Sequence, residues 1–229
     1  NYEDYSYYGM KSANSINQGC DGQSVQKKGR NVEWAWDNSV AYNNTFNEVH
    51  RVSALFSMSY SRLAGNYNQV NAQGYGNDLF GYKNMSGASD KEHVYYASDF
   101  WASTLASYML RANYSFDSRY YITLTGRFDG SSKFGENNKY AFFPSAGLAW
   151  NVSRESWLAD NKTISNLKLH TSYGMTGNSE IGTYASLGKV SNGTLLINGT
   201  RNPYSYISTI ANPDLKWEKT GQFDVGFNL

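Results

Sequence analysis

The sequence predicts an all-β fold, in which about seven antiparallel strands form part of a transmembrane β-barrel wall. Three observations predict it: a polar composition that is rich in rings, alternation of apolar and polar residues, and alternating short and long connections. Only 40% of the 229 residues are apolar and the mean hydropathy is −0.61, yet 16% are aromatic. Tyr, Trp, Phe and Thr favour strands, whereas Asn, Gly and Ser favour turns and loops. This composition excludes a helical domain and a disordered chain.

Seven segments alternate apolar and polar side chains with a period of two residues, which is the primary signal for a strand. Each segment therefore has one apolar face, with Asn38 and Leu55 as exceptions. In chain order, the apolar faces contain Trp34, Trp36, Val40 and Tyr42; Val52, Ala54, Phe56, Met58 and Tyr60; Tyr108, Leu110, Ala112, Tyr114 and Phe116; Tyr120, Ile122, Leu124 and Phe128; Phe142, Ala146, Leu148, Trp150 and Val152; Leu167, Leu169, Tyr173 and Met175; and Leu215, Trp217, Phe223, Val225, Phe227 and Leu229.

The connections between these segments alternate in length. Short turns are predicted around residues 43–45 and at 117–119, and the connection at 153–166 has room for one helical turn at 154–158. Long polar loops are predicted at 63–102, 130–139 and 178–214. Short periplasmic turns and long extracellular loops are the topology of a transmembrane barrel. We therefore interpret residues 1–31 as the end of an extracellular loop and residues 32–229 as barrel strands and loops.

Aromatic residues gather near both ends of the predicted strands, as the two interfaces of a bilayer require. A strand of about ten residues, tilted by roughly 40°, spans about 25 Å, which is the height of an outer-membrane apolar band. The rings near the short turns are Tyr42, Phe46, Phe116, Tyr120, Trp150 and Phe227, and those near the long loops are Trp34, Tyr60, Phe128, Phe142, Tyr173 and Trp217.

A soluble β-sandwich also has alternating strands and stays open as an alternative. The polar faces of the predicted strands carry charged residues, among them Arg111, Arg127, Asp129 and Lys168. Charges in these positions favour a water-filled lumen. The alternating loop lengths and the rings at the strand ends favour the barrel as well.

The charge balance and the reactive residues exclude several functions. A net charge of +1 gives no electrostatic footprint for nucleic acid. Cys20 is the only cysteine, so no disulfide framework is possible within the chain. His50, His93 and His170 lie on separate segments without metal-ligand spacing. With no phosphate-binding loop and no nominated carboxylate pair, we predict neither an enzyme nor a metal or cofactor site.

A series of sequence blocks follows between residues 120 and 220. They are Arg127-Phe128-Asp129-Gly130-Ser131-Ser132-Lys133-Phe134-Gly135; Phe143-Pro144-Ser145; Ala149-Trp150; Ser153-Arg154-Glu155; Leu167-Lys168-Leu169; Ser172-Tyr173-Gly174-Met175-Thr176-Gly177-Asn178; and Asn212-Pro213-Asp214-Leu215-Lys216-Trp217-Glu218-Lys219-Thr220. In this order the blocks closely resemble the barrel of SusC/RagA-type TonB-dependent outer-membrane receptors. The resemblance covers roughly residues 31–229.

The resemblance implies a barrel of about 22 strands in the outer membrane of a Gram-negative bacterium, closed by an N-terminal plug and driven by TonB. It also implies a SusD-like surface lipoprotein as a partner and oligosaccharides, or sometimes peptides, as cargo. The sequence shows no signal sequence, TonB box or plug, so we interpret it as a fragment of the barrel that contacts TonB only through the missing plug. A soluble glycan-binding sandwich, a passive porin and a siderophore-type receptor are the alternative functions.

We expect the residues of the resembling blocks to have structural roles at the strand ends. Gly130 is expected to take a positive φ in a turn that Asp129 and Ser131 cap, and Arg127 to pair with Asp129 or with a plug carboxylate. Pro144 cannot donate to a ladder, so a bulge or gap is expected there. The structural set is Arg127, Asp129, Gly130, Ser131, Ser132, Phe134, Phe143, Pro144, Ser145, Trp150, Gly174, Gly177, Asn178, Asn212, Pro213, Leu215, Trp217 and Glu218.

The long loops contain the candidate ligand-binding residues. A flat ring offers an apolar platform for the face of a sugar, and the neighbouring amides and carboxylates can bind its hydroxyl groups. Packing among the loops, or contact with the lipoprotein, is the alternative role for these rings. The candidates are Tyr75, Tyr82, Tyr95, Tyr96, Trp101, Tyr184, Tyr204 and Tyr206.

Overall fold

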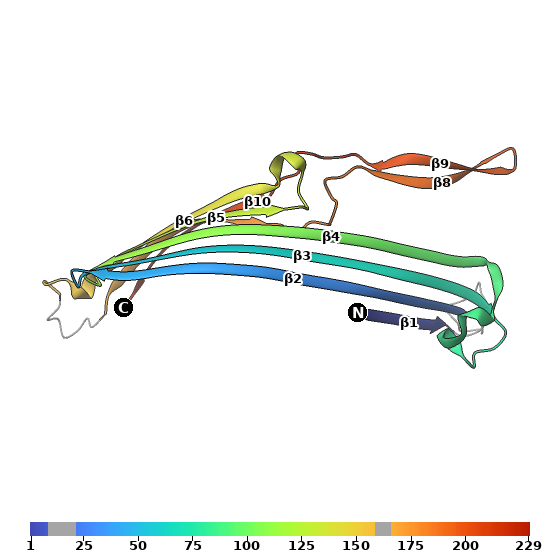
Figure 1. The fold of residues 1–229 in the computed structure, drawn as a ribbon, viewed down its shortest axis with the longest axis horizontal. Coiled ribbons are helices and arrows are strands. Elements are labelled where there is room, and N and C mark those ends of the chain that lie inside the picture. Colours follow the sequence, from blue (N-terminus) through green and yellow to red (C-terminus); the bar gives the residue numbers. More distant parts are fainter. Residues whose placement is uncertain (9–21, 159–165) are drawn as a thin grey trace. The chain divides into compact units, whose positions relative to one another are not determined.

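The computed structural model describes residues 1–8, 22–158 and 166–229, so Cys20 and our expectation for it lie outside the described residues. Three short 3-10 helices and ten strands follow one another in these ranges (Figure 1). They are β1 (Tyr2–Tyr8), β2 (Gln23–Phe46), β3 (His50–Tyr75), η1 (Gly81–Gly87), β4 (Ala88–Phe116), β5 (Tyr120–Ser131), η2 (Glu136–Asn138), β6 (Tyr140–Asn151), η3 (Val152–Arg154), β7 (Lys168–Asn178), β8 (Lys189–Ile197), β9 (Thr200–Thr209) and β10 (Glu218–Asn228).

The strands form one eight-stranded sheet in the order β1-β2-β3-β4-β5-β6-β7-β10, and β8 and β9 pair separately as a hairpin. The registered pairs β1–β2, β4–β5, β5–β6, β6–β7 and β7–β10 are all antiparallel. The prediction of an all-β antiparallel fold is therefore confirmed. No helix within the described ranges is long and apolar enough to cross a membrane.

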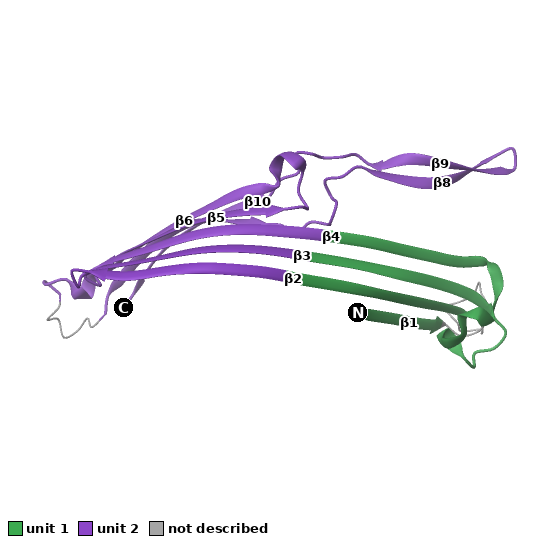
Figure 2. Cartoon of the chain, viewed as in Figure 1, with its two compact units in different colours: residues 1–34, 63–102 green, residues 35–62, 103–229 purple. Residues whose placement is uncertain are grey.

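The first compact unit comprises residues 1–34 and 63–102, drawn in green in Figure 2. Within it, β1 pairs with the start of β2 from Tyr2↔Gly29 to Tyr8↔Gln23. A small core contains Ala72, Tyr75 and Ala88, packed against partly buried Tyr7 and Met85.

Long polar loops were predicted for residues 1–31 and 63–102, whereas strands cover most of the described residues in these ranges. Strands β2, β3 and β4 contain 24, 26 and 29 residues, far more than the roughly ten that a membrane span needs. Pairing between neighbouring strands therefore continues through Asn-, Gln- and Ser-rich stretches. The preference of Asn, Gln and Ser for loops is weak, so the hydrogen bonds between paired strands determine the structure there.

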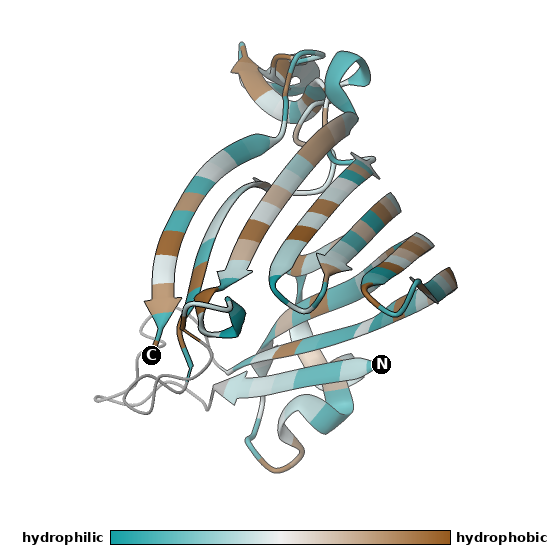
Figure 3. Ribbon diagram, turned by 90° about the vertical axis from the view of Figure 1, so that its left-hand side faces the viewer, coloured by the Kyte–Doolittle hydropathy of each residue, from teal (hydrophilic) through white to brown (hydrophobic). Residues whose placement is uncertain are grey.

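The second compact unit comprises residues 35–62 and 103–229, drawn in purple in Figure 2. Its register places apolar residues of neighbouring strands side by side, in rows across the sheet. One such row is Phe116, Tyr120, Trp150, Leu169 and Phe227. We call this side the apolar face, and brown and teal bands alternate along the strands accordingly (Figure 3).

The opposite side of the same strands is the polar face. Its rows include Asn113, Thr123, Gly147, Ser172 and Asp224. The side chains of the apolar face are exposed, with Leu110, Leu124 and Leu148 between 53% and 57% accessible. Within the described residues, therefore, no second sheet covers this face as a β-sandwich would require.

Two tight turns connect β2 to β3 and β4 to β5. Asn47 and Glu48 have φ of 48° and 63°, and Asp117 and Ser118 have φ of 50° and 51°. Two consecutive positive φ values match the right-handed twist of a hairpin, and Asn and Asp tolerate them well. The turn predicted at 43–45 is misplaced, because β2 continues to Phe46 and the turn follows it.

The long loop predicted at 178–214 also contains regular structure. Strands β8 and β9 pair from Lys189↔Thr209 to Ile197↔Thr200, with a register shift after Lys189. The Asn198-Gly199 turn between them has positive φ at both residues, which is the preferred two-residue hairpin turn. The polar composition of this stretch hid the hairpin from the sequence pattern.

Candidate functional site

The ladder between β6 and β7 stops beside Pro144. Strand β6 pairs with β5 along its whole length, from Tyr120↔Trp150 to Gly130↔Tyr140. Its pairing with β7 runs only from Asn151↔Lys168 to Ser145↔Gly174. Proline has no N–H to donate, so the ladder ends there, as predicted.

Three aromatic rings pack together next to this gap, and we call them the aromatic wedge: Phe134, Phe143 and Trp217. They are 1%, 5% and 7% accessible, the most buried aromatic side chains among the described residues of the second unit. The Phe134 and Trp217 ring centroids lie 4.6 Å apart, and those of Phe143 and Trp217 lie 5.6 Å apart in an edge-on arrangement. Edge-on and tilted ring pairs add stability beyond their buried area.

Hydrogen bonds join the segments that contribute the wedge. Trp217 Nε1 donates to the Lys139 carbonyl at 3.0 Å, and Gly135 N donates to the Leu215 carbonyl at 2.9 Å. Asn137 Nδ2 donates to Asp214 Oδ1 at 2.8 Å. A Cβ at Gly135 would lie 2.0 Å from the Pro213 carbonyl oxygen, so only glycine fits there. The loop after β5 is thus held against residues 212–217.

Further residues form hydrogen bonds around the contact between the loop after β5 and residues 212–217. Ser186 Oγ donates to the Phe134 carbonyl, and Asn212 Oδ1 accepts the N–H of Asp214, which forms the predicted turn at Pro213. Asn178 Nδ2 donates to Glu218 Oε2 at 3.0 Å across the β7–β10 pair. Four of the resembling blocks, which lie between residues 127 and 220, therefore meet at one place in the fold, whereas Ala149-Trp150 and Leu167-Lys168-Leu169 pair at the other end of β6 and β7.

Arg127 and Asp129 form an ion pair on the polar face, as the alternation of β5 predicted. Arg127 Nε lies 2.8 and 2.7 Å from the two oxygens of buried Asp129, and Arg127 NH2 contacts Ser107 Oγ at 3.3 Å. Ser131 Oγ accepts the N–H of Lys133, and Ser132 Oγ accepts the N–H of Thr104. Ser107 was not singled out from the sequence, because its position opposite Asp129 depends on the register.

The predicted role of Gly130 is wrong. Gly130 lies inside β5, pairs with Tyr140 and is not among the glycines with positive φ. A Cβ at Gly130 would lie 2.1 Å from the Tyr140 ring, and one at Gly177 would lie 2.2 Å from the Phe143 ring. A larger residue at either position would require the adjacent aromatic ring to move, because the ring lies against the bare backbone.

Below the wedge, the polar face contains two adjacent pockets of about 420 and 480 Å³. Both are lined by Arg111, Thr125, Ser145 and Thr176. The first pocket also includes Phe143 and Trp217, and the second includes Gly147 and Gly174. Gly174, Ser145 and Trp217 thus border a cavity as well as supporting the strands.

The ring candidates of the first unit fall into two groups. Tyr75 is 6% accessible and its hydroxyl lies 2.5 Å from Ser24 Oγ, so its ring belongs to the small core. Tyr82 stacks on Tyr5 at 4.9 Å, and the Trp101 ring covers Gly65. By contrast, Tyr95 and Tyr96 are 57% and 72% accessible and, as consecutive strand residues, point to opposite faces. These two rings present open faces.

The ring candidates of the second unit lie around the β8–β9 hairpin. Tyr204 and Tyr206 stack with centroids 5.6 Å apart and are about half exposed. Tyr204 covers Gly193 on the neighbouring strand, where a Cβ would lie 2.7 Å from the ring. Tyr184 has φ of 63° and lies in the turn before the hairpin, where its carbonyl accepts the N–H of Leu187.

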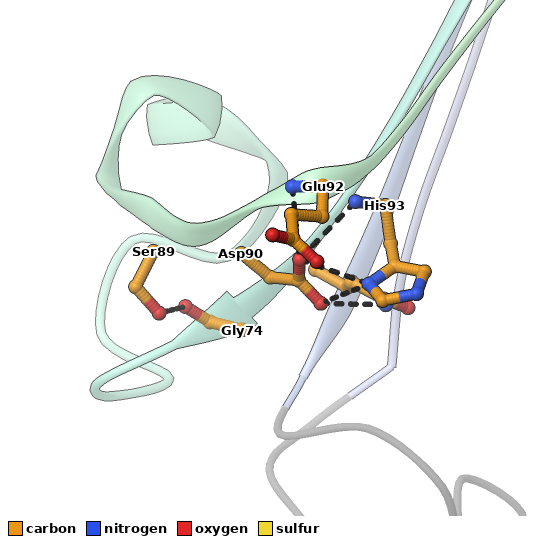
Figure 4. A network of polar contacts seen from close by, with 6 residues as sticks. Gly74, Ser89, Asp90, Glu92 and His93 are labelled. Atoms are coloured by element: carbon orange, nitrogen blue, oxygen red, sulfur yellow. Dashed lines mark hydrogen bonds and ion pairs between the residues drawn. The ribbon is translucent and has the colours of Figure 1, made fainter. Parts of the chain in front are cut away.

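A polar network joins β3 to β4 in the first unit (Figure 4). Asp90 Oδ1 accepts the backbone N–H groups of Glu92 and His93, while Asp90 Oδ2 accepts Gln73 Nε2 at 2.9 Å and lies 2.8 Å from His93 Nδ1. Ser89 Oγ donates to the carbonyl of Gly74, which has φ of 82°. These bonds hold the start of β4.

Within the described ranges, no group of three or more His, Cys, Asp or Glu side chains is arranged for a metal ion.

The predicted row of rings near the short turns is present. The Phe116, Tyr120 and Trp150 rings stack at successive spacings of 6.4 Å. Glu155, which follows η3, accepts hydrogen bonds from the Tyr120 hydroxyl at 2.7 Å, Trp150 Nε1 at 3.0 Å and Arg119 at 3.2 Å. The bond from Tyr120, then those from Trp150 and Arg119, hold the pKa of Glu155 below its usual range. Glu155 belongs to the resembling block Ser153-Arg154-Glu155, but its hydrogen-bond partners could not be predicted from the sequence because they lie on β5, on β6 and in the turn before β5.

Comparisons with known proteins agree with this architecture. The whole chain, residues 1–229, matches the family described as TonB dependent receptor-like, beta-barrel. It is 32% identical over 94% of its length to TonB-dependent receptor P26 of Formosa agariphila, and 37% identical over 61% of its length to TonB-dependent receptor SusC of Bacteroides thetaiotaomicron. It spans 22% and 14% of those two proteins.

A solved structure of the RagAB peptide transporter superposes on 98% of this chain, with a TM-score of 0.83 and 28% identity, and the chain covers 24% of that protein. The same importer in its "open-open" state gives a TM-score of 0.80. The resemblance to SusC/RagA-type receptors is confirmed, and the chain belongs to the TonB-dependent receptor-like β-barrel family.

Proposed function

We propose that this chain is part of the barrel wall of an outer-membrane importer that takes up oligosaccharides or peptides. The observation that carries the proposal is the two-faced sheet, with continuous rows of apolar residues on one face and of polar residues on the other. A wall between lipid and a watery lumen needs this arrangement. The match along residues 1–229 supports it.

The proposed orientation places the tight turns at 47–49 and 117–119 in the periplasm of a Gram-negative bacterium. The long ends of β2, β3 and β4, and the β8–β9 hairpin, would then be extracellular. Stacked rings near the short turns, with Glu155 and Arg119 beside them, suit the membrane–water interface, where rings with one polar end gather.

The proposed partners are TonB, acting through a plug, and a SusD-like lipoprotein. The names SusC and RagAB among the similar proteins support this proposal. A passive porin is the second candidate, because a two-faced wall serves it equally well. We propose no enzymatic activity, and transport by the full-length parent receptor would be powered through TonB.

Two measurements test this function. In a full-length receptor whose native cysteines, Cys20 included, are replaced by serine, single cysteines replace Ser118 and Gly87. Intact cells are then treated with a membrane-impermeant thiol reagent. Labelling at residue 87 and none at 118 is expected; the reverse pattern would refute the orientation.

Uptake is then measured with and without a protonophore. Uptake that continues unchanged after the proton gradient collapses would favour the porin.

A further inference from the structure

The apolar face of the second unit contains a pocket of about 460 Å³. Thr171 is a short side chain between Leu148 and Val225, and its hydroxyl is already bonded to the Asp224 carbonyl at 3.1 Å, so it leaves an apolar depression. In the proposed barrel the plug lies on the other side of the wall and does not cover this pocket. Two neighbouring rows line it: Tyr120, Trp150 and Leu169, and Ile122, Leu148, Thr171 and Val225.

A charged cluster borders the side of this pocket that is nearest the short turns. Tyr120 and Trp150 line the pocket and donate hydrogen bonds to Glu155. Arg119 Nη1 lies 3.2 Å from Glu155 Oε2, and Arg119 Nη2 lies 3.0 Å from Asp117 Oδ2. The Arg119 guanidinium also lies over the Tyr120 ring, with its Cζ 5.8 Å from the ring centroid. The cluster therefore lies against the same apolar face as the pocket.

This cluster contains one more acid than base. Arg119 is shared by Asp117 and Glu155, which leaves a formal charge of −1. The hydrogen bonds from Tyr120 and then Trp150 hold the pKa of Glu155 below its usual range, so its charge persists at neutral pH. The Asp117 side chain is 48% exposed and pairs through Oδ2, so Oδ1 is available to a further donor.

Two other cations lie close to the cluster in the sequence or in the fold. Lys168 Nζ lies 4.8 Å from the centroid of the Tyr121 ring, which belongs to the polar face, so Lys168 does not neutralise the cluster. Arg154, next to Glu155, is exposed and has no ion-pair partner among the described residues. It is therefore available to a phosphate group that approaches the cluster.

We infer that the pocket and the cluster together bind one phosphatidylethanolamine molecule, with an acyl chain in the pocket and the ammonium group on Asp117 and Glu155. A primary ammonium has three N–H donors, and carboxylates accept them in charge-assisted hydrogen bonds. The trimethylammonium of phosphatidylcholine has no such donor, and phosphatidylglycerol has no cationic group. The inference rests on the proposed barrel wall and adds a specific lipid partner on its outer surface.

The test is native mass spectrometry of the full-length receptor in detergent, with equal amounts of phosphatidylethanolamine, phosphatidylcholine and phosphatidylglycerol that carry the same acyl chains. We expect the wild type to retain phosphatidylethanolamine roughly fivefold to tenfold more than the others, as a charge-assisted hydrogen bond at a partly exposed site allows. D117N should lose this preference, because the cluster becomes neutral while asparagine tolerates the positive φ of this turn residue.

D224N is the matched control for the charge. Asp224 is a carboxylate on the polar face of the same wall, so its replacement should leave the preference unchanged. A second pair of variants tests the acyl chain. T171L fills the depression and should lower the retention of all three lipids, whereas T171V keeps its volume and should retain them as the wild type does.

Other outcomes overturn the inference. Equal retention of the three lipids by the wild type, or an equal loss of preference in D117N and D224N, would remove the role of the cluster. Equal retention in T171L and T171V would place the acyl chain elsewhere. A lipid-free dimer that T171L dissociates would show that a second copy of the receptor covers the pocket. Uptake and cysteine labelling test the proposed function separately, so the function can stand where the lipid inference fails.

Discussion

Replacing Phe134 by alanine should release the loop after β5 from residues 212–217. Phe134 is 1% accessible and its ring packs against Trp217 at 4.6 Å. Its carbonyl accepts a hydrogen bond from Ser186, and Gly135 next to it is bonded to Leu215. The Phe134 side chain therefore packs beside the hydrogen bonds that join these segments.

The expected magnitude follows from the burial of the ring. Truncating a buried phenylalanine to alanine costs about 3–5 kcal/mol, including the cavity that remains. If this loss falls on the local contact instead of the whole barrel, the population with the loop released rises by a factor of roughly 100 or more. Amide hydrogens that are protected only by this contact should exchange faster by the same factor.

The assay is hydrogen exchange of the full-length receptor in lipid nanodiscs. The reporting amides are Gly135 N and Asn137 N, whose partners are the carbonyls of Leu215 and Pro213. F142A is the matched control, because Phe142 lies on the same side of the gap but is 51% accessible on the apolar face. Unchanged exchange at residues 135 and 137 in F134A would refute the reasoning, as would an equal rise in F142A.

Three further changes test other parts of the structure. L124R, on the exposed apolar face, should destabilise the parent barrel by about 2–4 kcal/mol in lipid unfolding experiments, whereas T123R on the polar face should be mild. Because folding lowers the pKa of Glu155, the ionised carboxylate stabilises the folded state fully above its ordinary pKa of 4.5. This stabilisation is lost as the pH falls through the lowered pKa of the folded state. The difference in thermal midpoint between wild type and E155Q should therefore shrink only below about pH 4.5. Tyr95, Tyr96 and Trp101 of the first unit are replaced together by alanine, and cargo uptake is measured at matched receptor levels. Each ring that contacts the cargo should account for a loss of uptake of up to about tenfold. Unchanged uptake would mean that these rings serve packing or contact with the lipoprotein instead of cargo binding.

The alternation of the second unit could be predicted because each strand there has one apolar face. Leu110, Leu124 and Leu148 follow the period-two pattern, and the register places each within an apolar row. The strands of the first unit could not be found in this way. Both faces of β2–β4 are polar there, so the pattern disappears although the backbone pairing continues.

The sequence predicted single residues of the candidate site, but not which residues of other strands they contact. Parity placed Arg127 and Asp129 on one face, and the missing N–H of Pro144 predicted the end of a ladder. Ser107, Glu155 and the partner of Gly130 depend on which residues of other strands lie opposite, and the sequence alone does not define that register. Consequently, the positive φ expected at Gly130 was wrong, and the close approach of the Tyr140 ring to its backbone could not be predicted.

The ladder gap explains why three separate sequence blocks meet in one cluster. Once Pro144 ends the pairing of β6 with β7, the backbone of β6 beyond it has lost a neighbouring strand. The Phe143 ring packs edge-on against Trp217, which lies just before β10, and Phe134 from the loop after β5 packs on the same indole. Trp217 Nε1 also bonds the Lys139 carbonyl just before β6. The missing N–H of Pro144 thus leaves a space that side chains from β6, from the loop after β5 and from residues 212–217 fill together. This packing holds the segments from which the β8–β9 hairpin extends.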